Sequence, residues 1–340
     1  MVNGVLSLIG QTPILELTRI FKYAHFRLYA KLEASNPGGS IKDRAAISII
    51  DRAIETGEIT PNSVVIESSS GNMGIGLAQV CSYYGLRFIC VIDPKTTAQN
   101  TGILKAYGAE VDLVKEPDSV TGEFLQARID RVKHLLRSNE NSFWPNQYAN
   151  LYNARAHHKT MHEIVAALGE RLDYLFCAVS TCGTIRGCAE YLKEHGLKTK
   201  LIAVDALGSA IFGAPSAKRK RLIPGHGAAV RPQLFEPDLA DDCIYVTDVD
   251  CIVGCRRLVR QEAILAGGSS GAVLMAVERT QHLIPNDAVC VMIFPDRGER
   301  YLDTIYSDEW VTEHFGKIEQ VQESSYTKGA AAREAREHRN

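Results

Sequence analysis

The sequence lacks an excess of charge of either sign and contains no long apolar segment. Its 340 residues carry 38 Lys and Arg against 40 Asp and Glu, a formal net charge of −2 at pH 7. Nucleic-acid-binding proteins generally show a basic excess or stripe, so this class is not expected. No apolar run approaches the roughly 20 residues of a membrane-spanning helix, and no basic segment precedes a short apolar core, as in a secretion signal. We therefore expect a soluble, cytoplasmic protein that binds neither nucleic acid nor membrane.

The nine cysteines are scattered through apolar runs and form no C-x-x-C pair. Cys251 and Cys255 are too widely spaced for half of a typical zinc site. An odd number of cysteines in apolar surroundings is typical of buried, reduced thiols. We therefore predict neither a disulfide scaffold nor a bound metal.

Short apolar, β-branched runs alternate with amphipathic segments along most of the chain. This alternation is typical of the α/β class, in which parallel sheets carry helices on both faces, and the length suggests two domains. The predicted strands are 26–32, 63–67, 87–92, 110–114, 174–179, 200–205 and 288–294. The predicted helices are 42–56, 74–84, 99–107, 122–138, 154–168, 184–195, 249–266 and 270–282.

Two stretches depart from this alternation. Residues 206–242 are rich in Gly and Pro and include a basic cluster at 218–221. We interpret this cluster as a solvated loop face, with an anion-binding role as the less favoured alternative. Residues 317–340 are polar and offer few apolar anchors. Such a segment gains too little from burial to become ordered, so we predict a flexible tail.

Polar, glycine-rich corners follow several of the predicted strands. The first, NPGGSIKDR at 36–44, turns directly into a helix that begins near Lys42. The positive end of the helix dipole disfavours a cation there. Lys42 is therefore an anion ligand or an amine tuned toward its neutral, nucleophilic form, and a solvent-facing lysine is the equal alternative.

Further corners are ESSSGNMG at 67–74, STCGT at 180–184, GGSSG at 267–271 and PDRGERY at 295–301. The corner at 67–74 does not have the G-x-G-x-x-G order of a dinucleotide site. The corner at 180–184 lacks the lysine of a P-loop, so its backbone N–H groups and hydroxyls suit a monophosphate. Together the corners predict an anionic cofactor and an anionic substrate.

In this order and spacing, the motifs make residues 3–310 resemble the fold-type II enzymes that use pyridoxal 5′-phosphate (PLP), in the cysteine synthase and cystathionine β-synthase group. The resemblance implies two doubly wound, three-layer αβα domains with PLP between them. The large PLP-binding domain would comprise residues 1–39 and 148–316, and the small mobile domain residues 40–147. It also implies a homodimer.

The resemblance assigns the cofactor contacts residue by residue. Lys42 matches the lysine that binds PLP covalently and moves protons at the substrate Cα, and Asn72 matches the asparagine that contacts the cofactor ring oxygen. Ser269 matches the residue facing the pyridine nitrogen, where a neutral hydroxyl favours β-elimination and β-replacement over transamination. The phosphate cup matches Ser180, Thr181, Cys182, Gly183 and Thr184, with Ser180 and Cys182 replacing two glycines of the family.

The substrate contacts implied by the resemblance are Ser69, Ser70, Gly71, Met73 and Gln147, with Tyr148 shaping the second-substrate site. Finer features, among them NQYAN at 146–150, resemble one branch in which the amine of L-glutamate replaces the phosphate at Cβ of O-phospho-L-serine. Such a transferase forms a C–N bond in the supply of 2,3-diaminopropionate for siderophores. The alternative is a cysteine synthase that uses O-acetylserine or O-phosphoserine and sulfide. A dehydratase and a catalytically silent binding protein of the same fold also remain open.

Overall fold

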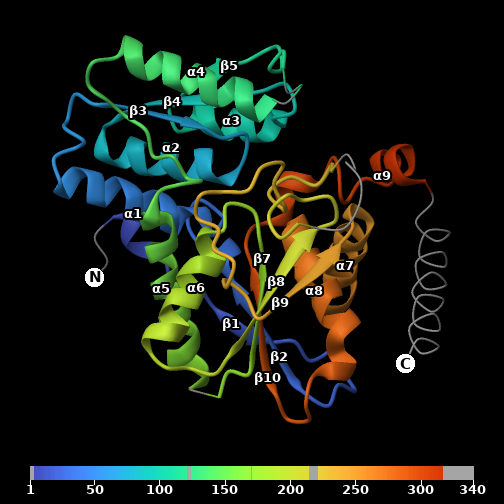
Figure 1. Cartoon of the computed structure of the whole chain (residues 1–340). Coiled ribbons are helices and arrows are strands. Elements are labelled where there is room, and N and C mark those ends of the chain that lie inside the picture. The colour runs from blue at the N-terminus through green and yellow to red at the C-terminus, as the bar shows by residue number, and fades with distance from the viewer. Residues whose placement is uncertain (1–3, 121, 123, 170, 214–220, 317–340) are drawn as a thin grey trace.

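The computed structural model describes residues 4–120, 122, 124–169, 171–213 and 221–316. Two sheets, each covered by helices on both faces, lie one above the other (Figure 1). The larger sheet has the order β1(Ile14–Glu16), β2(Arg27–Leu32), β10(Val289–Phe294), β7(Tyr174–Ala178), β8(Lys200–Ala206) and β9(Asp242–Val246). The smaller sheet has the order β5(Glu110–Leu113), β4(Arg87–Ile92), β3(Val64–Ser68) and β6(Ser142–Phe143).

The larger sheet pairs a strand from the first part of the chain with a strand from the last part. β2 pairs in parallel with β10, so that Arg27 lies opposite Val289, and β10 pairs in parallel with β7. All residues of β10 are buried, as expected for a strand with a helical layer on each face. One layer contains α5(Leu151–Leu168) and α6(Gly183–Glu194), and the other contains α7(Asp248–Glu262) and α8(Gly268–Thr280) (Figure 1).

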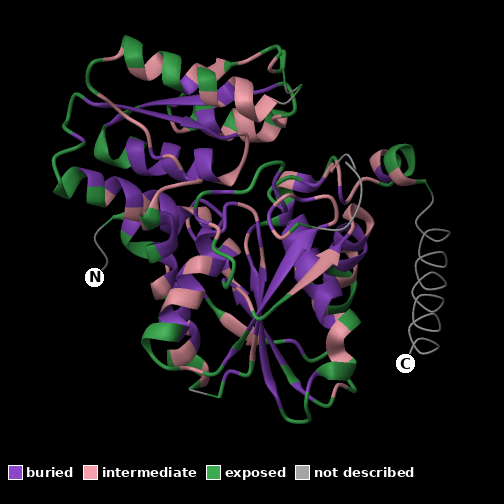
Figure 2. Cartoon of the chain, in the orientation of Figure 1, coloured by how far each residue is buried: buried purple, intermediate pink, exposed green. Residues whose placement is uncertain are grey.

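The smaller sheet is entirely parallel. On one face, α1(Lys42–Glu55), α2(Asn72–Tyr84) and α3(Ala98–Ala106) enclose an apolar core. On the other face, α4(Phe124–Ser138) buries Val132 against β3 and β4. Figure 2 shows the resulting pattern, with buried residues along both sheets and exposed residues on the outer helix faces.

The structure confirms the predicted α/β class and each of the predicted strands and helices, with shifted ends in most of them. The strands β1, β6 and β9, which are short or at a sheet edge, were not predicted from the sequence, and neither was α9(Asp308–Phe315). The predicted helix 249–266 was wrong at its C-terminus. There α7 ends at Glu262 because Ala263 adopts a left-handed φ of 57° and its N–H bonds back to Leu258 and Val259.

The strands of the smaller sheet lie between residues 64 and 143, inside the predicted small domain. The domain limits themselves stay a prediction. The predicted tail, 317–340, and residues 218–220 of the basic cluster lie outside the described residues. Within the described ranges, no helix combines the length and apolar character needed to cross a membrane.

Candidate active site

A pocket at the carboxyl end of β7 brings three of the predicted segments together. Its wall contains Lys42 from the start of α1, the loop 180–184 that opens α6, and Ser269 from the first turn of α8. Ligands of α/β proteins commonly bind where strands end and helices begin. Corners that are far apart in the sequence therefore form one cavity.

Lys42 is a partly buried amine without a partner. Its Nζ makes no hydrogen bond or ion pair with any described residue, although it lines the pocket. Burial lowers the pKa of Lys42, while the nearby charge of Asp296 acts in the opposite direction. The neutral, nucleophilic form is thus more populated than in a free lysine. The solvent-facing alternative for Lys42 does not hold.

The loop 180–184 presents backbone N–H groups to the pocket. No described residue accepts from the N–H groups of Cys182, Gly183 and Thr184, and α6 has no side-chain cap. A side chain at position 183 is excluded, because a Cβ there would lie 2.2 Å from Asn153 Oδ1. Free N–H groups at a helix start form a favourable site for an anion.

Cys182 occupies a position where the fold-type II enzymes that the sequence resembles have glycine. It adopts a left-handed conformation with φ of 65°, which costs a non-glycine residue roughly 1–2 kcal/mol. Its side chain packs with the apolar core between the larger sheet and α6. Burial raises the pKa of the Cys182 thiol to about 12, so the thiol stays neutral. The backbone of the loop therefore keeps a glycine-like turn despite the substitution.

The donors around the pocket fit a small phosphorylated aldehyde. Lys42 offers an unpaired amine for a covalent bond to the aldehyde, and the loop offers N–H groups for the phosphate. Ser269 is buried overall, and its hydroxyl makes no hydrogen bond with a described residue, so it is free to face a ring nitrogen. This set of donors matches the chemistry of PLP.

Asn72, at the start of α2, is not in the wall of this pocket. Its Nδ2 donates to Asp296 Oδ2 at 2.8 Å, and Arg300 donates to its Oδ1. Asp296 also accepts from Tyr301, and Arg300 also donates to Gly38. Burial raises the pKa of Asp296, although these hydrogen bonds oppose the rise. The Asn72 amide thus bridges the smaller sheet to the segment 296–301.

The corner after β3 holds the predicted carboxylate-binding residues. Ser69 is buried and its Oγ accepts from Gly74 N at 2.9 Å, whereas Ser70 and Gly71 are partly exposed. Met73 is 2% exposed and packs in the core of the smaller sheet, so only its backbone is near this corner. Gln147 Nε2 donates to Ser68 O at 3.4 Å.

A second hollow lies between α4 and the loop 230–233. Tyr148 and Trp144 line it together with Glu67 and Lys133. Burial raises the pKa of Tyr148, so its hydroxyl stays protonated at neutral pH. The neighbouring residues Gln147 and Tyr148 place this hollow next to the corner after β3.

Two buried residues near this hollow escaped the sequence analysis. Burial raises the pKa of Glu67 to about 7, and its carboxylate accepts from Ser68 N and Trp144 Nε1. Arg128 forms an ion pair with Asp93, in which Nε lies 3.2 Å from Oδ2. This contact does not have hydrogen-bond geometry, so Nε and Nη1 of Arg128 donate to no acceptor among the described residues. An acidic residue near the end of an apolar strand is unusual, so Glu67 could have been singled out from the sequence. Arg128 lies in an ordinary amphipathic helix pattern and could not.

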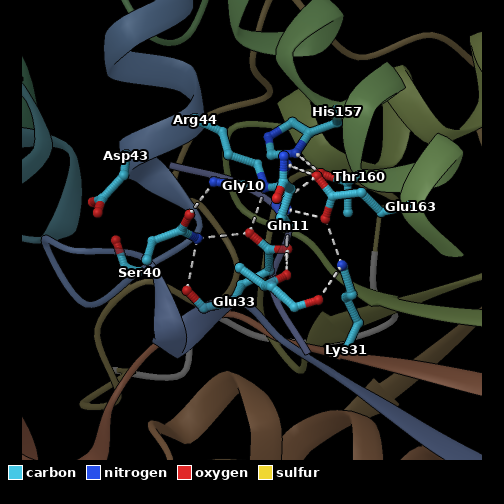
Figure 3. Close-up of polar contacts among 12 residues, drawn as sticks. Gly10, Gln11, Lys31, Glu33, Ser40, Asp43, Arg44, His157, Thr160 and Glu163 are labelled. Atoms are coloured by element: carbon cyan, nitrogen blue, oxygen red, sulfur yellow. Dashed lines mark hydrogen bonds and ion pairs between the residues drawn. The ribbon is translucent and has the colours of Figure 1, made fainter. Parts of the chain in front are cut away.

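A buried ionic cluster fixes the start of α1 (Figure 3). Arg44 donates to both carboxylate oxygens of Glu33, at 2.7 and 2.8 Å, and to both of Glu163, at 2.7 and 2.6 Å. Lys31 from β2 donates to Glu163 at 2.5 Å. Because Arg44 follows Lys42 on the same helical turn, the cluster holds the pocket lysine against the larger sheet.

The fold and the pocket together define a PLP enzyme of fold type II. The chain belongs to the pyridoxal-phosphate dependent enzyme family, whose sequence profile matches residues 5–296. It is 44% identical over 313 residues to an N-(2-amino-2-carboxyethyl)-L-glutamate synthase of Cupriavidus metallidurans, covering 91% of each chain. A protein of the same name from Ralstonia nicotianae is 44% identical over 310 residues, with 91% of each chain covered. Among solved structures, an O-acetylserine dependent cystathionine β-synthase from Helicobacter pylori is similar, with a TM-score of 0.82 and 32% identity over 90% of this chain and 99% of that one.

Proposed function

We propose that the protein catalyses β-replacement on O-phospho-L-serine with the amine of L-glutamate as the nucleophile. The products are N-(2-amino-2-carboxyethyl)-L-glutamate and phosphate, the former a precursor of 2,3-diaminopropionate and siderophores. The observation that carries this proposal is the 44% identity, over 91% of the chain, to two relatives named as synthases of that compound. The anion-binding character of the pocket and the free amine of Lys42 support it.

Lys42 holds the cofactor covalently and moves the proton at the substrate Cα in this proposal. When bound, PLP withdraws electrons from Cα and so makes loss of the α-proton and of the β-substituent possible. The absence of a partner for Nζ and the lowered pKa of Lys42 support both roles. Arg44 keeps α1 in place while the proton moves, because its guanidinium is held by the buried carboxylate of Glu33 and the partly buried carboxylate of Glu163.

Except for Asn72, which lies outside the wall, the other cofactor contacts follow from the residues that line the pocket. We assign the phosphate to Ser180, Thr181, Cys182, Gly183 and Thr184, mainly through backbone N–H groups. Ser269 faces the ring nitrogen with a neutral hydroxyl, which does not hold that nitrogen protonated and so favours β-replacement. Asn72 contacts the ring oxygen, with its amide oriented by Asp296 and Arg300.

The substrates occupy the corner after β3 and the second hollow in this proposal. Ser69, Ser70 and Gly71 bind the α-carboxylate of the serine substrate, assisted by Gln147. Tyr148 shapes the hollow for the second amino acid. Glutamate carries two carboxylates, and the side chains of Lys133 and Arg231, which line the hollow, supply positive charge there.

Product analysis tests the reaction directly. We expect purified enzyme with PLP, O-phospho-L-serine and L-glutamate to release phosphate and to form the C–N-linked adduct, detected by mass spectrometry. Sulfide in place of glutamate is the matched control. Cysteine formation with sulfide, without any adduct from glutamate, would contradict the proposal and favour a cysteine synthase. Pyruvate and ammonia as the only products would favour a dehydratase.

We further propose a cytoplasmic homodimer in which the small domain, 40–147, moves on substrate binding. All nine cysteines are unpaired and most are buried, which suits a reducing compartment. The homodimer and the domain movement follow from the resemblance to fold-type II enzymes, and both concern the surroundings of the pocket rather than its chemistry.

A further inference from the structure

His157 lies on α5 directly behind the loop 180–184. Its side chain is fully buried, with 0% exposed. The Nε2 atom is 3.3 Å from Thr184 Oγ1, and the Nδ1 atom is 3.2 Å from Thr160 Oγ1. Thr184 lines the pocket, and Figure 3 shows His157 and Thr160 beside the ionic cluster. A continuous chain of polar contacts thus runs from α5 to the pocket.

The imidazole in this chain is neutral. Burial, together with the positive charges of Lys42 and Arg44, lowers the pKa of His157 well below its usual value. A neutral imidazole has one N–H group and one accepting nitrogen. The contacts of His157 therefore have a direction, which depends on the nitrogen that carries the proton.

The direction decides what the Thr184 hydroxyl can offer to the pocket. A hydroxyl has a single proton. If Nε2 of His157 accepts that proton, none remains for an anion in the loop. If Nε2 carries hydrogen and donates to Thr184 Oγ1, the hydroxyl proton is free for a phosphate oxygen, and the Thr160 hydroxyl donates to Nδ1. A bond to a phosphate is charge-assisted and stronger than one to a neutral nitrogen, so an anion selects the second arrangement.

We infer that His157 is a positioning residue, protonated at Nε2, which turns the Thr184 hydroxyl proton toward the phosphate of PLP. This inference rests on the proposed assignment of residues 180–184 as the phosphate site. It explains why a buried histidine, rather than an apolar residue, occupies this place on α5. It also gives α5 a part in cofactor binding without direct contact.

The dissociation constant of PLP, measured by equilibrium dialysis of the holoenzyme, tests the inference. We expect Thr184→Val to weaken PLP binding by about 10-fold or more, the usual size of one hydrogen bond to a charged group. His157→Phe should weaken it by a smaller factor, because the Thr184 hydroxyl keeps its proton but loses the donor that orients it. The double variant should bind no more weakly than Thr184→Val, because His157 acts only through Thr184. His157→Gln, whose amide N–H replaces the Nε2 donor, should bind within a few-fold of the wild type, which guards against a folding defect in the Phe variant.

The tautomer of His157 is a second readout, and it is measured on the wild-type holoenzyme. Nitrogen NMR of the holoenzyme with ¹⁵N-labelled histidine should show a neutral His157 with hydrogen on Nε2, its signals identified by their absence in His157→Gln. Hydrogen on Nδ1, or additive losses in the double variant, would overturn the positioning role alone. Unchanged PLP affinity in Thr184→Val would also overturn it, because the hydroxyl would then not contact the phosphate, whereas the phosphate site, which rests mainly on backbone N–H groups, would stand.

Discussion

Replacement of Lys42 by alanine is expected to abolish the visible absorbance that arises from the covalent PLP–lysine bond and to reduce turnover by at least about 10³-fold. A positioned general base alone typically contributes 10²–10⁴-fold, and this variant also removes the covalent attachment of the cofactor. The loop 180–184 and Ser269 remain intact, so PLP should still be retained without a covalent bond. Absorbance spectra and phosphate release from O-phosphoserine are the measurements.

Chemical trapping identifies the attachment site independently. Borohydride reduction of the wild-type holoenzyme, followed by peptide mass spectrometry, should place the cofactor on the peptide that contains Lys42. Lys22→Ala is the matched control, because that lysine is exposed and lies over the ring of Tyr23. Cofactor found on another lysine, or visible absorbance retained by Lys42→Ala, would show that the central assignment is wrong.

Replacement of Arg44 by alanine is expected to destabilise the protein by about 3–5 kcal/mol, the usual effect of breaking a buried ion pair. The guanidinium is 3% exposed and its partners Glu33 and Glu163 are 0% and 18% exposed. Without it, Glu33 keeps a buried charge with no opposite charge bonded to it. Arg44→Lys should recover only part of the loss, because an ammonium cannot make the paired contacts to two carboxylates. Urea unfolding followed by circular dichroism is the measurement.

The matched control is Arg27→Ala, which removes an arginine–glutamate pair of the same type at the surface. Arg27 and Glu16 are 58% and 39% exposed, so we expect a loss of less than about 1 kcal/mol. Equal losses in the two variants would show that the cluster around Arg44 contributes no more than a surface pair.

The contribution of this cluster should also depend on pH. Burial acts to raise the pKa of Glu163, but hydrogen bonds from Arg44 and Lys31 outweigh it and lower the pKa to about 2 from a usual value of 4.5. Because the folded-state pKa is depressed, this stabilisation is complete above pH 4.5 and declines as the pH falls toward 2. The difference in stability between the wild type and Arg44→Ala should therefore shrink over that window.

Local patterns in the sequence were sufficient to predict most helices and strands, and the polar character of the loops that follow the strands. The alternation of apolar strands with amphipathic helices reports only on neighbouring residues, and it located β4 to the residue. The position of Lys42 at a helix start restricted it to a few roles, and the motifs shared with a known family then selected one. β9 was missed because it is a half-buried edge strand after a Gly- and Pro-rich loop, where the apolar pattern is weak.

Contacts between distant segments were outside the reach of these patterns. Arg44 meets Glu163 and Asn72 meets Asp296 only because β2 lies beside β10 and α1 packs on α5, and no local period encodes either contact. The sequence by itself determined the α/β class, the polar corners and the candidate lysine. The tertiary structure decided that Lys42 is partly buried and unpaired, that its helix is held by an ionic cluster, and that His157 lies behind Thr184. The physical reason is that pKa shifts and hydrogen-bond direction depend on desolvation and on neighbours, which exist only once the chain is packed.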